Sequence, residues 1–314
     1  MSQPQITILM PVRNAEAYID AAVDSILRQT EPSFVLLVID DGSTDRSVER
    51  VLARSDPRIR LVSDGQQRGV IDRLNWGLDN ATTDYVARMD ADDISAPDRL
   101  ARQLRFMQEH PEIGICGSWY SGFSDTGTLW EARLPENHPG LVAMMPFASP
   151  LAHGSVLMRR SVLTRFGLRY APEAVHAEDY DLWERAAAVT RLANIPAMLY
   201  AYRVHPGQVS ERFSAEQRRQ SDRVRGRALA RLGVACSAEQ LRIHCAVATG
   251  TGCETVGASY AALRWIRYLR RSVSGGSDVQ RAIAETCRRL ESDLIRRIRR
   301  QVLHALRIGR RPGH

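Results

Sequence analysis

The first 120 residues alternate between two hydrophobic periods. Short apolar runs at residues 5–12, 34–40, 58–63, 84–90 and 113–119 have the composition of buried strands. Between these runs, apolar residues recur at spacings of three and four, which predicts helices over residues 15–30, 43–55, 70–81 and 96–110. Tyr18 falls on the apolar face of the first of these helices. Strands that alternate with helices through short loops predict a mostly parallel sheet with helices on both of its faces.

The pattern changes after about residue 125. Residues 155–160 and 197–205 have the pattern of strands, and residues 178–189 have that of a helix. Beyond residue 211 the chain is predicted to be mostly helical, with breaks near residues 232–237 and 272–278. The sequence therefore predicts an α/β domain over residues 1–210 and a helical region over residues 211–314.

Charge divides the chain in the same way. The sequence of 314 residues contains no lysine, so all 43 basic residues are arginines, which we attribute to genome composition. Residues 1–202 hold 20 arginines and 27 acids, whereas residues 203–314 hold 23 arginines and 9 acids. No apolar stretch is long enough to span a membrane. The start of the chain lacks a secretion signal, and five cysteines without a CxxC pair indicate reduced thiols, so we expect a cytoplasmic protein.

Two acidic clusters follow predicted strands. Asp40 and Asp41 come at the end of one strand, and Asp90, Asp92 and Asp93 come at the end of another. Carboxyl ends of parallel strands form one rim of the sheet, which is where ligands bind in such folds. Asp90 and Asp92 could converge on Mg²⁺ or Mn²⁺. The alternatives are a solvated turn and, for Asp93, an N-cap of the following helix.

Two further groups of polar residues are candidates for chemistry. Glu178 and Asp179 begin a predicted helix, where an acid more often complements the helix dipole than acts in catalysis. Arg203 and His205 flank the end of a predicted strand, and a lone histidine is usually a satisfied polar residue. Taken singly, each group allows a purely structural interpretation.

Six segments occur together in a recognisable order: "ITILMPVRNAEAYIDAAVDSILRQT", "VIDDGSTD", "RGVIDRLNWGL", "YVARMDADD", "HAEDYDLWERA" and "YRVHPGQVS". With them the chain resembles the nucleotide-sugar-dependent glycosyltransferases of family 2 over residues 5–210. The resemblance implies a GT-A (Rossmann-like) fold, with a nucleotide-binding half over residues 1–120 and an acceptor and catalytic half over residues 121–210. Residues 211–314 lie outside the resemblance.

The resemblance also implies roles for the acidic rim. Pro11, Asp40 and Asp41 would line the nucleobase pocket. Asp90 would meet the ribose or the metal, and Asp92 would bind the metal directly. The implied metal is Mn²⁺ or Mg²⁺.

Further roles come from the second half of the resemblance. Asp179 would be the general base with Glu178 beside it, and we expect Glu178 and Asp181 to raise its pKa. His205 would reach the metal or the diphosphate, together with Arg203. These assignments imply an inverting transfer from a nucleotide sugar, expected to carry UDP, to a hydroxyl of a surface polysaccharide or lipid-linked glycan.

One loop departs from the family pattern. Gln67 stands where many relatives have an asparagine before the glycine, here Gly69. The arginine of this loop is displaced to Arg73, which we keep as a nucleotide-sugar-binding candidate. The departure concerns the residues that would contact the base and ribose from this loop.

The arginine-rich tail has two interpretations. Residues 279–306 carry an apolar stripe with arginines on the opposite face (Ile283, Cys287, Leu290, Leu294, Ile298, Val302 and Leu306). The stripe could lie on anionic lipid, giving peripheral membrane contact through residues 263–308, to which the two aromatics of residues 263–271 would add. Alternatively it packs on the catalytic domain. Nucleic-acid binding is not expected because no recognition motif accompanies the arginines. A non-catalytic nucleotide-sugar-binding protein is the other alternative.

Overall fold

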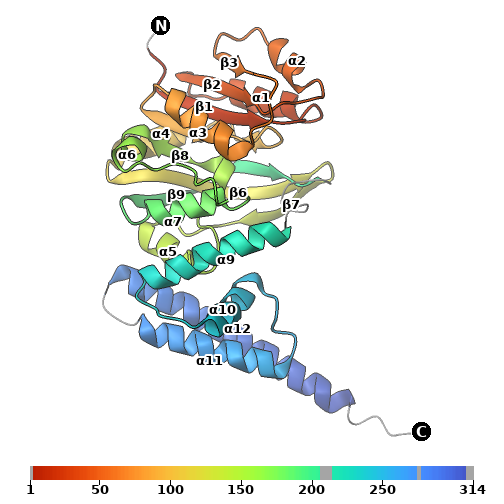
Figure 1. Cartoon of the computed structure of the whole chain (residues 1–314), viewed down its shortest axis with the longest axis vertical. Helices are drawn as coiled ribbons and strands as arrows, with labels where there is room; N and C mark the ends of the chain where they lie inside the picture. Colours follow the sequence, from red (N-terminus) through yellow and green to blue (C-terminus); the bar gives the residue numbers. More distant parts are fainter. Residues whose placement is uncertain (1–2, 206–213, 274–276, 309–314) are drawn as a thin grey trace, which may run out of the picture. The chain divides into compact units, whose positions relative to one another are not determined.

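The computed structural model describes residues 3–205, 214–273 and 277–308 (Figure 1). The chain forms two compact units, one made of Met1–Leu141 with Pro150–Gln220 and the other of Val142–Ser149 with Ser221–His314. The predicted boundary between residues 210 and 211 lies outside the described residues, as do residues 206–210 of the last family segment. The division in the structure falls within a helix, before Ser221.

The first unit contains a mixed sheet and its covering helices. Its strands are β1 (Ile6–Val12), β2 (Phe34–Asp40), β3 (Ile59–Val62), β4 (Tyr85–Arg88), β5 (Ile94–Ser95), β6 (Ile113–Ser124), β7 (Gly127–Ala132), β8 (Leu157–Arg159) and β9 (Arg191–Arg203). Its helices are α1 (Ile19–Leu27), α2 (Ser47–Leu52), α3 (Val70–Asn80), α4 (Arg99–Glu109), the 3-10 helix η1 (His153–Ser155), α6 (Arg160–Arg165) and α7 (Glu178–Ala186), while α5 (His138–Met144) runs into the second unit.

The sheet runs in the order β3-β2-β1-β4-β8-β6-β9-β5, with β7 paired to β6. Strands β1 to β4 are mutually parallel and β6 is parallel to β9, whereas β5, β7 and β8 pair antiparallel with their neighbours. The predicted mostly parallel sheet is therefore confirmed. Strand β1 lies between β2 and β4, and the ends of these strands carry the two acidic clusters.

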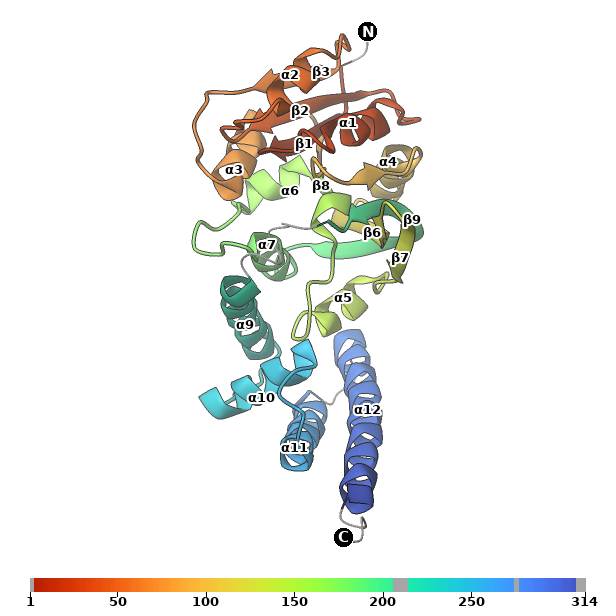
Figure 2. The same cartoon turned by 90° about the vertical axis from the view of Figure 1, so that its right-hand side faces the viewer.

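Helices cover both faces of the parallel half because each strand is apolar on both sides. Ile8 and Met10 belong to the core cluster that also contains the buried residues of α1 and α4. Leu9 and Ile39 point to the other face, where Gly77 of α3 leaves no room for a side chain: a Cβ there would lie 2.9 Å from each. Figure 2 shows α1 on one side of these strands and α3 on the other.

Several element boundaries differ from the predictions. Helix α1 begins at Ile19 rather than at residue 15, and the predicted strand over residues 155–160 gives way to α6 at Arg160. Strand β9 begins at Arg191, before the predicted start, and β6 continues to Ser124 to form a hairpin with β7. The end of β6 is mostly partly exposed, with polar and aromatic residues, whereas the start of β9 is buried but is interrupted by Asn194 and Pro196, so neither extension forms a continuous apolar run.

The second unit is helical. Its helices are the later part of α9 (Ser214–Arg231), α10 (Ala238–Thr249), α11 (Val256–Ser272) and α12 (Asp278–Ile308). Ser237 and Gln240 form a capping box at the start of α10, and Thr255 caps α11. Gln301 of α12 donates to the carbonyl of Cys253 just before α11, and Arg267 pairs with Glu291, so α11 and α12 run antiparallel.

The apolar stripe of the tail packs within this unit. Ile283, Cys287, Leu294 and Ile298 of α12 are buried in one cluster with the inner face of α11. The stripe is therefore covered by packing within this unit and is not open to lipid. Of its described members only Val302 is exposed, and the side chain of Leu306 lies outside the described part. No helix in the described part of the chain has the length and apolar content needed to cross a membrane.

Candidate active site

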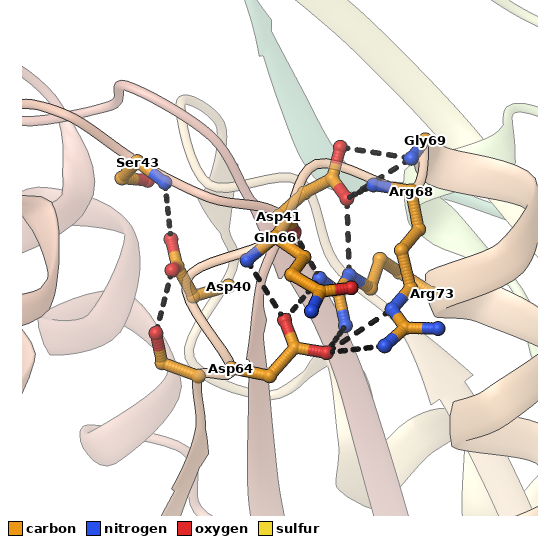
Figure 3. A network of polar contacts seen from close by, with 9 residues as sticks. Asp40, Asp41, Ser43, Asp64, Gln66, Arg68, Gly69 and Arg73 are labelled. Carbon is orange, nitrogen blue, oxygen red and sulfur yellow. Dashed lines mark hydrogen bonds and ion pairs between the residues drawn. The ribbon is translucent and has the colours of Figure 1, made fainter.

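The acids after β2 hold a neighbouring loop. Asp41 accepts the backbone N–H groups of Arg68 (2.7 Å) and Gly69 (3.0 Å) and the Nε–H of Arg73 (3.0 Å), as Figure 3 shows. Asp40 is almost fully buried and accepts the N–H of Ser43 (3.1 Å). Of the two predicted nucleobase acids, Asp41 thus orders the neighbouring loop at residues 68–69, whereas Asp40 holds the turn at Ser43.

The buried side chain of Arg73 also holds the loop of residues 64–69. Its side chain is only 5% exposed, and besides Asp41 it pairs with Asp64 at 2.7 Å and donates to the Gln66 carbonyl (Figure 3). The guanidinium is therefore engaged by protein groups, which favours a supporting role over direct contact with the nucleotide. Its assignment as a nucleotide-binding residue stays a prediction.

Gly42 is required where the two loops meet. Its φ of +70° is in the left-handed region, and a Cβ there would lie 2.9 Å from the backbone carbon of Gln66 and the nitrogen of Gln67. The glycine of the "DDGS" segment thus lets the loop of residues 64–69 close directly over the end of β2. Pro11 lies nearby on β1, opposite Ile39 in the register of the sheet.

The second acidic cluster is organised around buried arginine and tyrosine. Asp90 pairs with Nη2 of Arg88 at 2.6 Å and accepts the hydroxyl of Tyr200 at 3.2 Å. Burial works against the ionised form, but the Arg88 cation outweighs it and lowers the pKa of Asp90. Asp90 is therefore ionised and firmly oriented at the carboxyl end of β4.

Asp93 does not cap a helix, and that alternative is wrong. Helix α4 begins only at Arg99, with Asp98 in the cap position. Asp93 is 1% exposed and accepts the Tyr200 hydroxyl (2.6 Å) and the backbone N–H of Arg203 (2.7 Å). Burial, together with Asp90 and Asp92, raises its pKa to about 8. It ties the acidic loop to the end of β9.

The structure brings Asp92, His205 and Arg203 together, as the resemblance implies. Oδ2 of Asp92 lies 3.2 Å from Nε2 of His205, and its carbonyl accepts Nε–H of Arg203 at 2.7 Å. Arg203 also stacks over the rings of Tyr18 (5.0 Å) and Phe123 (4.5 Å).

Tyr18 is a site residue that the sequence did not indicate. Helical periodicity placed it in the core, but the helix starts one residue later, and its ring instead lies 4.6 Å from the ring of His205. Arg88 and Tyr200, the partners of Asp90, were also missed, because they come from buried strands that give no local signal.

The donors at Asp92 fit a divalent cation. In the described part of the chain no group of three or more His, Cys, Asp or Glu side chains is arranged to enclose a metal. Asp92 and His205 supply one carboxylate and one imidazole, and burial with the nearby Asp90 raises the pKa of Asp92. This negative crowding and a two-residue donor set suit Mg²⁺ or Mn²⁺, which commonly completes its shell with water and substrate phosphates.

Helix α7 presents Glu178 and Asp179 in its first turn. Burial raises the pKa of Asp179 to about 6, backbone hydrogen bonds oppose it, and Asp90 raises it further. Burial and Asp179 raise the pKa of Glu178 to about 7, and in the described part of the chain its buried Oε2 has no hydrogen-bond partner. The predicted contribution of Asp181 is wrong, because Asp181 pairs with Arg185 at 2.8 Å.

The comparisons with known proteins agree with this arrangement. Residues 7–167 match the family model described as glycosyl transferase family 2. An uncharacterized glycosyltransferase of Haemophilus influenzae is 30% identical over 239 residues, which are 71% of this chain and 72% of the relative. The amylovoran biosynthesis glycosyltransferase AmsE of Erwinia amylovora is 28% identical over 66% of this chain and 79% of its own.

Solved structures agree on the fold. TarS (residues 1–349) of S. aureus, in complex with UDP-GlcNAc, aligns with a TM-score of 0.61 at 17% identity over 96% of this chain and 92% of that one. The mannosyltransferase PcManGT of Pyrobaculum calidifontis, in complex with GDP-Man and Mn²⁺, aligns with a TM-score of 0.57 at 19% identity over 96% and 85%. The chain therefore belongs to glycosyl transferase family 2 and is a glycosyltransferase with the GT-A fold.

Proposed function

We propose that this glycosyltransferase moves a sugar from a UDP-linked donor to a hydroxyl acceptor with inversion at the anomeric carbon. The observation that carries the proposal is the state of Asp179, a carboxylate whose pKa is raised to about 6 and which is close enough to Asp90 to sense its charge. A base with this pKa is mostly ionised near neutral pH and still accepts a proton readily.

In this proposal different residues act on the two faces of the transferred sugar. Asp179 takes the proton of the acceptor hydroxyl as its oxygen forms a bond to the anomeric carbon. The bond from that carbon to the β-phosphate oxygen breaks on the opposite face, and the nucleoside diphosphate leaves. Glu178 lies beside Asp179 and is itself partly protonated near neutral pH, so it can hydrogen-bond to a substrate hydroxyl.

Asp92 and His205 would hold Mn²⁺ or Mg²⁺. When bound, this cation supplies positive charge to the leaving diphosphate. Arg203 orients the loop that carries Asp92 through its bond to the Asp92 carbonyl. Asp41, Asp40 and Pro11 would face the base, with Asp41 held in place by Arg73 and the backbone of residues 68–69.

The choice of nucleotide and pathway is supported by similarity. A protein of the same fold binds UDP-GlcNAc, although another binds GDP-Man, so the nucleotide has to be tested. AmsE acts in amylovoran biosynthesis and WbnJ of Escherichia coli in O-antigen biosynthesis. The acceptor proposed here is accordingly a growing surface polysaccharide or a lipid-linked glycan.

Titration calorimetry with UDP-, GDP- and dTDP-sugars, with and without Mn²⁺, tests the donor site. Wild-type protein and Asp98→Asn, an exposed acid on the far end of the same loop, should bind one donor in a metal-dependent way. Asp92→Asn should lose the dependence on metal. Asp179→Asn should keep donor binding and lose transfer. Donor binding without transfer in the wild type would instead support a non-catalytic nucleotide-sugar-binding protein.

The proposal also includes a peripheral contact of residues 263–308 with anionic membrane. It is supported by exposed arginines on α11 and α12, among them Arg264, Arg299 and Arg300, and by exposed Leu303. Cosedimentation with anionic vesicles should weaken in the double variant Arg299→Gln/Arg300→Gln and with added salt. Arg105→Gln, an exposed arginine of α4, is the matched control. Equal binding of all three proteins would contradict the contact.

A further inference from the structure

The 3-10 helix η1 is fixed against the acidic rim. A Cβ on Gly154 would lie 1.8 Å from the Tyr200 hydroxyl and 2.8 Å from Oδ2 of Asp90, so η1 packs on these groups backbone first. The fully buried Arg99 donates to the carbonyls of Gly154 (2.7 Å) and Arg88 (3.1 Å). The residue before Gly154 is His153, which is therefore held beside Asp90.

The imidazole of His153 faces the helix that carries the proposed base. Its ring centroid lies 6.2 Å from that of Trp183 on α7, edge to face. The first turn of the same helix carries Asp179. His153 thus lies between Asp90 and α7. In the proposed reaction the transferred sugar lies between the diphosphate and the base on α7. We therefore place the sugar in the same region as His153, between Asp90 and α7.

One ring nitrogen of His153 is already used. Nε2 lies 3.0 Å from the hydroxyl of Tyr170, whose backbone is clamped by the side chain of Asn75 through bonds of 2.8 and 3.0 Å. Burial raises the pKa of the Tyr170 hydroxyl, so it keeps its proton. A buried O–H needs an acceptor, and in the described part of the chain Nε2 is its partner. The tyrosine therefore donates to Nε2.

This contact determines the tautomer of the histidine. Burial and the charge of Arg88 lower the pKa of His153 to about 3, so the ring is neutral. With Nε2 accepting, the ring hydrogen resides on Nδ1. Among the described residues Nδ1 has no hydrogen-bond partner, and the side chain is only partly buried. His153 is a fixed, neutral donor.

We propose that Nδ1–H of His153 donates a hydrogen bond to a hydroxyl of the transferred sugar, so that His153 contributes to the choice of donor sugar. Tyr170 is then a positioning residue that sets the tautomer. The inference rests on the proposed function, because it requires a sugar nucleotide in the site. A diphosphate oxygen would accept the same hydrogen bond, and the experiment separates the two acceptors.

Two variants of similar size test the two ring nitrogens of His153 separately. His153→Gln keeps an amide near the position of Nε2 for Tyr170 but removes the donor at Nδ1, whereas His153→Asn places an amide nitrogen near Nδ1. Calorimetry would compare the tightest-binding sugar nucleotide of the panel with its nucleoside diphosphate alone. We expect His153→Gln to bind the sugar nucleotide about five- to tenfold more weakly, as for one lost hydrogen bond. His153→Asn should stay within about twofold, and both should bind the nucleoside diphosphate normally.

The outcomes are distinguishable. If His153→Gln weakens the nucleoside diphosphate as much as the sugar nucleotide, the bond goes to the diphosphate and the sugar assignment is overturned. Normal binding of the sugar nucleotide by His153→Gln also overturns it, while the proposed function stands. If the wild type binds no sugar nucleotide, the proposed function itself fails.

Tyr170 has a spectroscopic test of its own. The ¹⁵N shifts of His153 should show hydrogen on Nδ1 in the wild type and a shift toward hydrogen on Nε2 in Tyr170→Phe. A purely structural tyrosine would leave the tautomer unchanged.

Discussion

The raised pKa of Asp179 makes the rate of transfer depend on pH in a range where an ordinary aspartate would not. With a pKa of about 6, about nine tenths of Asp179 is ionised at about pH 7 and about one tenth at about pH 5. An aspartate with the ordinary pKa of about 3.9 would stay more than about nine tenths ionised over the same range. The proposed base therefore predicts a loss of about tenfold in kcat between about pH 7 and about pH 5.

The assay measures kcat at saturating donor, acceptor and metal, because kcat reports the groups that titrate in the complex. Glu178 and Asp179 are neighbours with pKa values of about 7 and about 6, so the profile reports a pair that titrates together. Glu178, with the higher pKa, is mostly protonated where Asp179 titrates, so Glu178→Gln removes little charge there and should leave the acidic limb near about pH 6. Asp181→Asn is the control, because Asp181 is paired with Arg185 and should leave the limb in place.

Two results would refute this reasoning. A flat profile between about pH 5 and pH 7 in the wild type would mean that the base is not a buried carboxylate. An acidic limb that disappears in Glu178→Gln would mean that the titrating group is Glu178 and not Asp179. Recovery of transfer by Asp179→Glu but not by Asp179→Asn would add that a carboxylate is needed at this place.

Three further predictions concern stability, measured by denaturant unfolding. Gly42→Ala should lower the free energy of unfolding by about 2–3 kcal/mol, because of its positive φ and its clash with the backbone of Gln66. Gly65→Ala, with a similar φ and open space around it, should lower it by about 1 kcal/mol. Equal losses would contradict the close contact at Gly42. Arg73→Met should cost about 2–3 kcal/mol by leaving buried Asp41 without its cation, against less than about 1 kcal/mol for Arg68→Met, whose ion pair is exposed; the reverse order would be inconsistent with the network. Asp179→Asn should stabilise the protein by about 1–2 kcal/mol at about pH 8 and not at about pH 4. The pKa of Asp179 is higher in the folded than in the unfolded protein, so the wild type loses stability as the pH rises from the unfolded-state pKa through about 6. A destabilised variant at about pH 8 would contradict the burial of this charge.

The sequence predicted the parts of this molecule that depend on local periodicity. Strands β1, β2 and β4 are apolar runs between helical patterns, and their acidic ends could be placed at one rim because parallel strands all end on the same side. The hairpin of β6 and β7 escaped prediction because Leu129 and Trp130 of β7 are exposed and the strand carries no buried face. Its existence depends on pairing with β6, a contact that no local pattern records.

In the candidate site, too, local sequence patterns predicted some features and not others. Asp41, Asp92 and Asp179 could be named from motifs, but what they touch could not. Arg88 and Tyr200 are buried in strands far apart in the sequence and meet only at Asp90. Likewise, the raised pKa of Asp179 was attributed to its neighbours Glu178 and Asp181, whereas burial is the largest cause and Asp90 adds to it. Electrostatic effects depend on distance in space and on burial, neither of which follows from spacing along the chain.

The crowding of acids at the rim has a consequence for the order of binding. Asp90 has the buried cation Arg88, and Asp93 has the Tyr200 hydroxyl and the N–H of Arg203, whereas Asp92 lies beside His205 with its pKa raised by burial and by Asp90. A nucleoside diphosphate alone would add negative charge to this space, and a cation alone would lack phosphate ligands for most of its shell. Each therefore provides what the other needs, so the affinity for each should rise in the presence of the other by the same factor. This reciprocity is the role that we propose for the acidic cluster: metal and donor bound together would relieve the repulsion between Asp90 and Asp92.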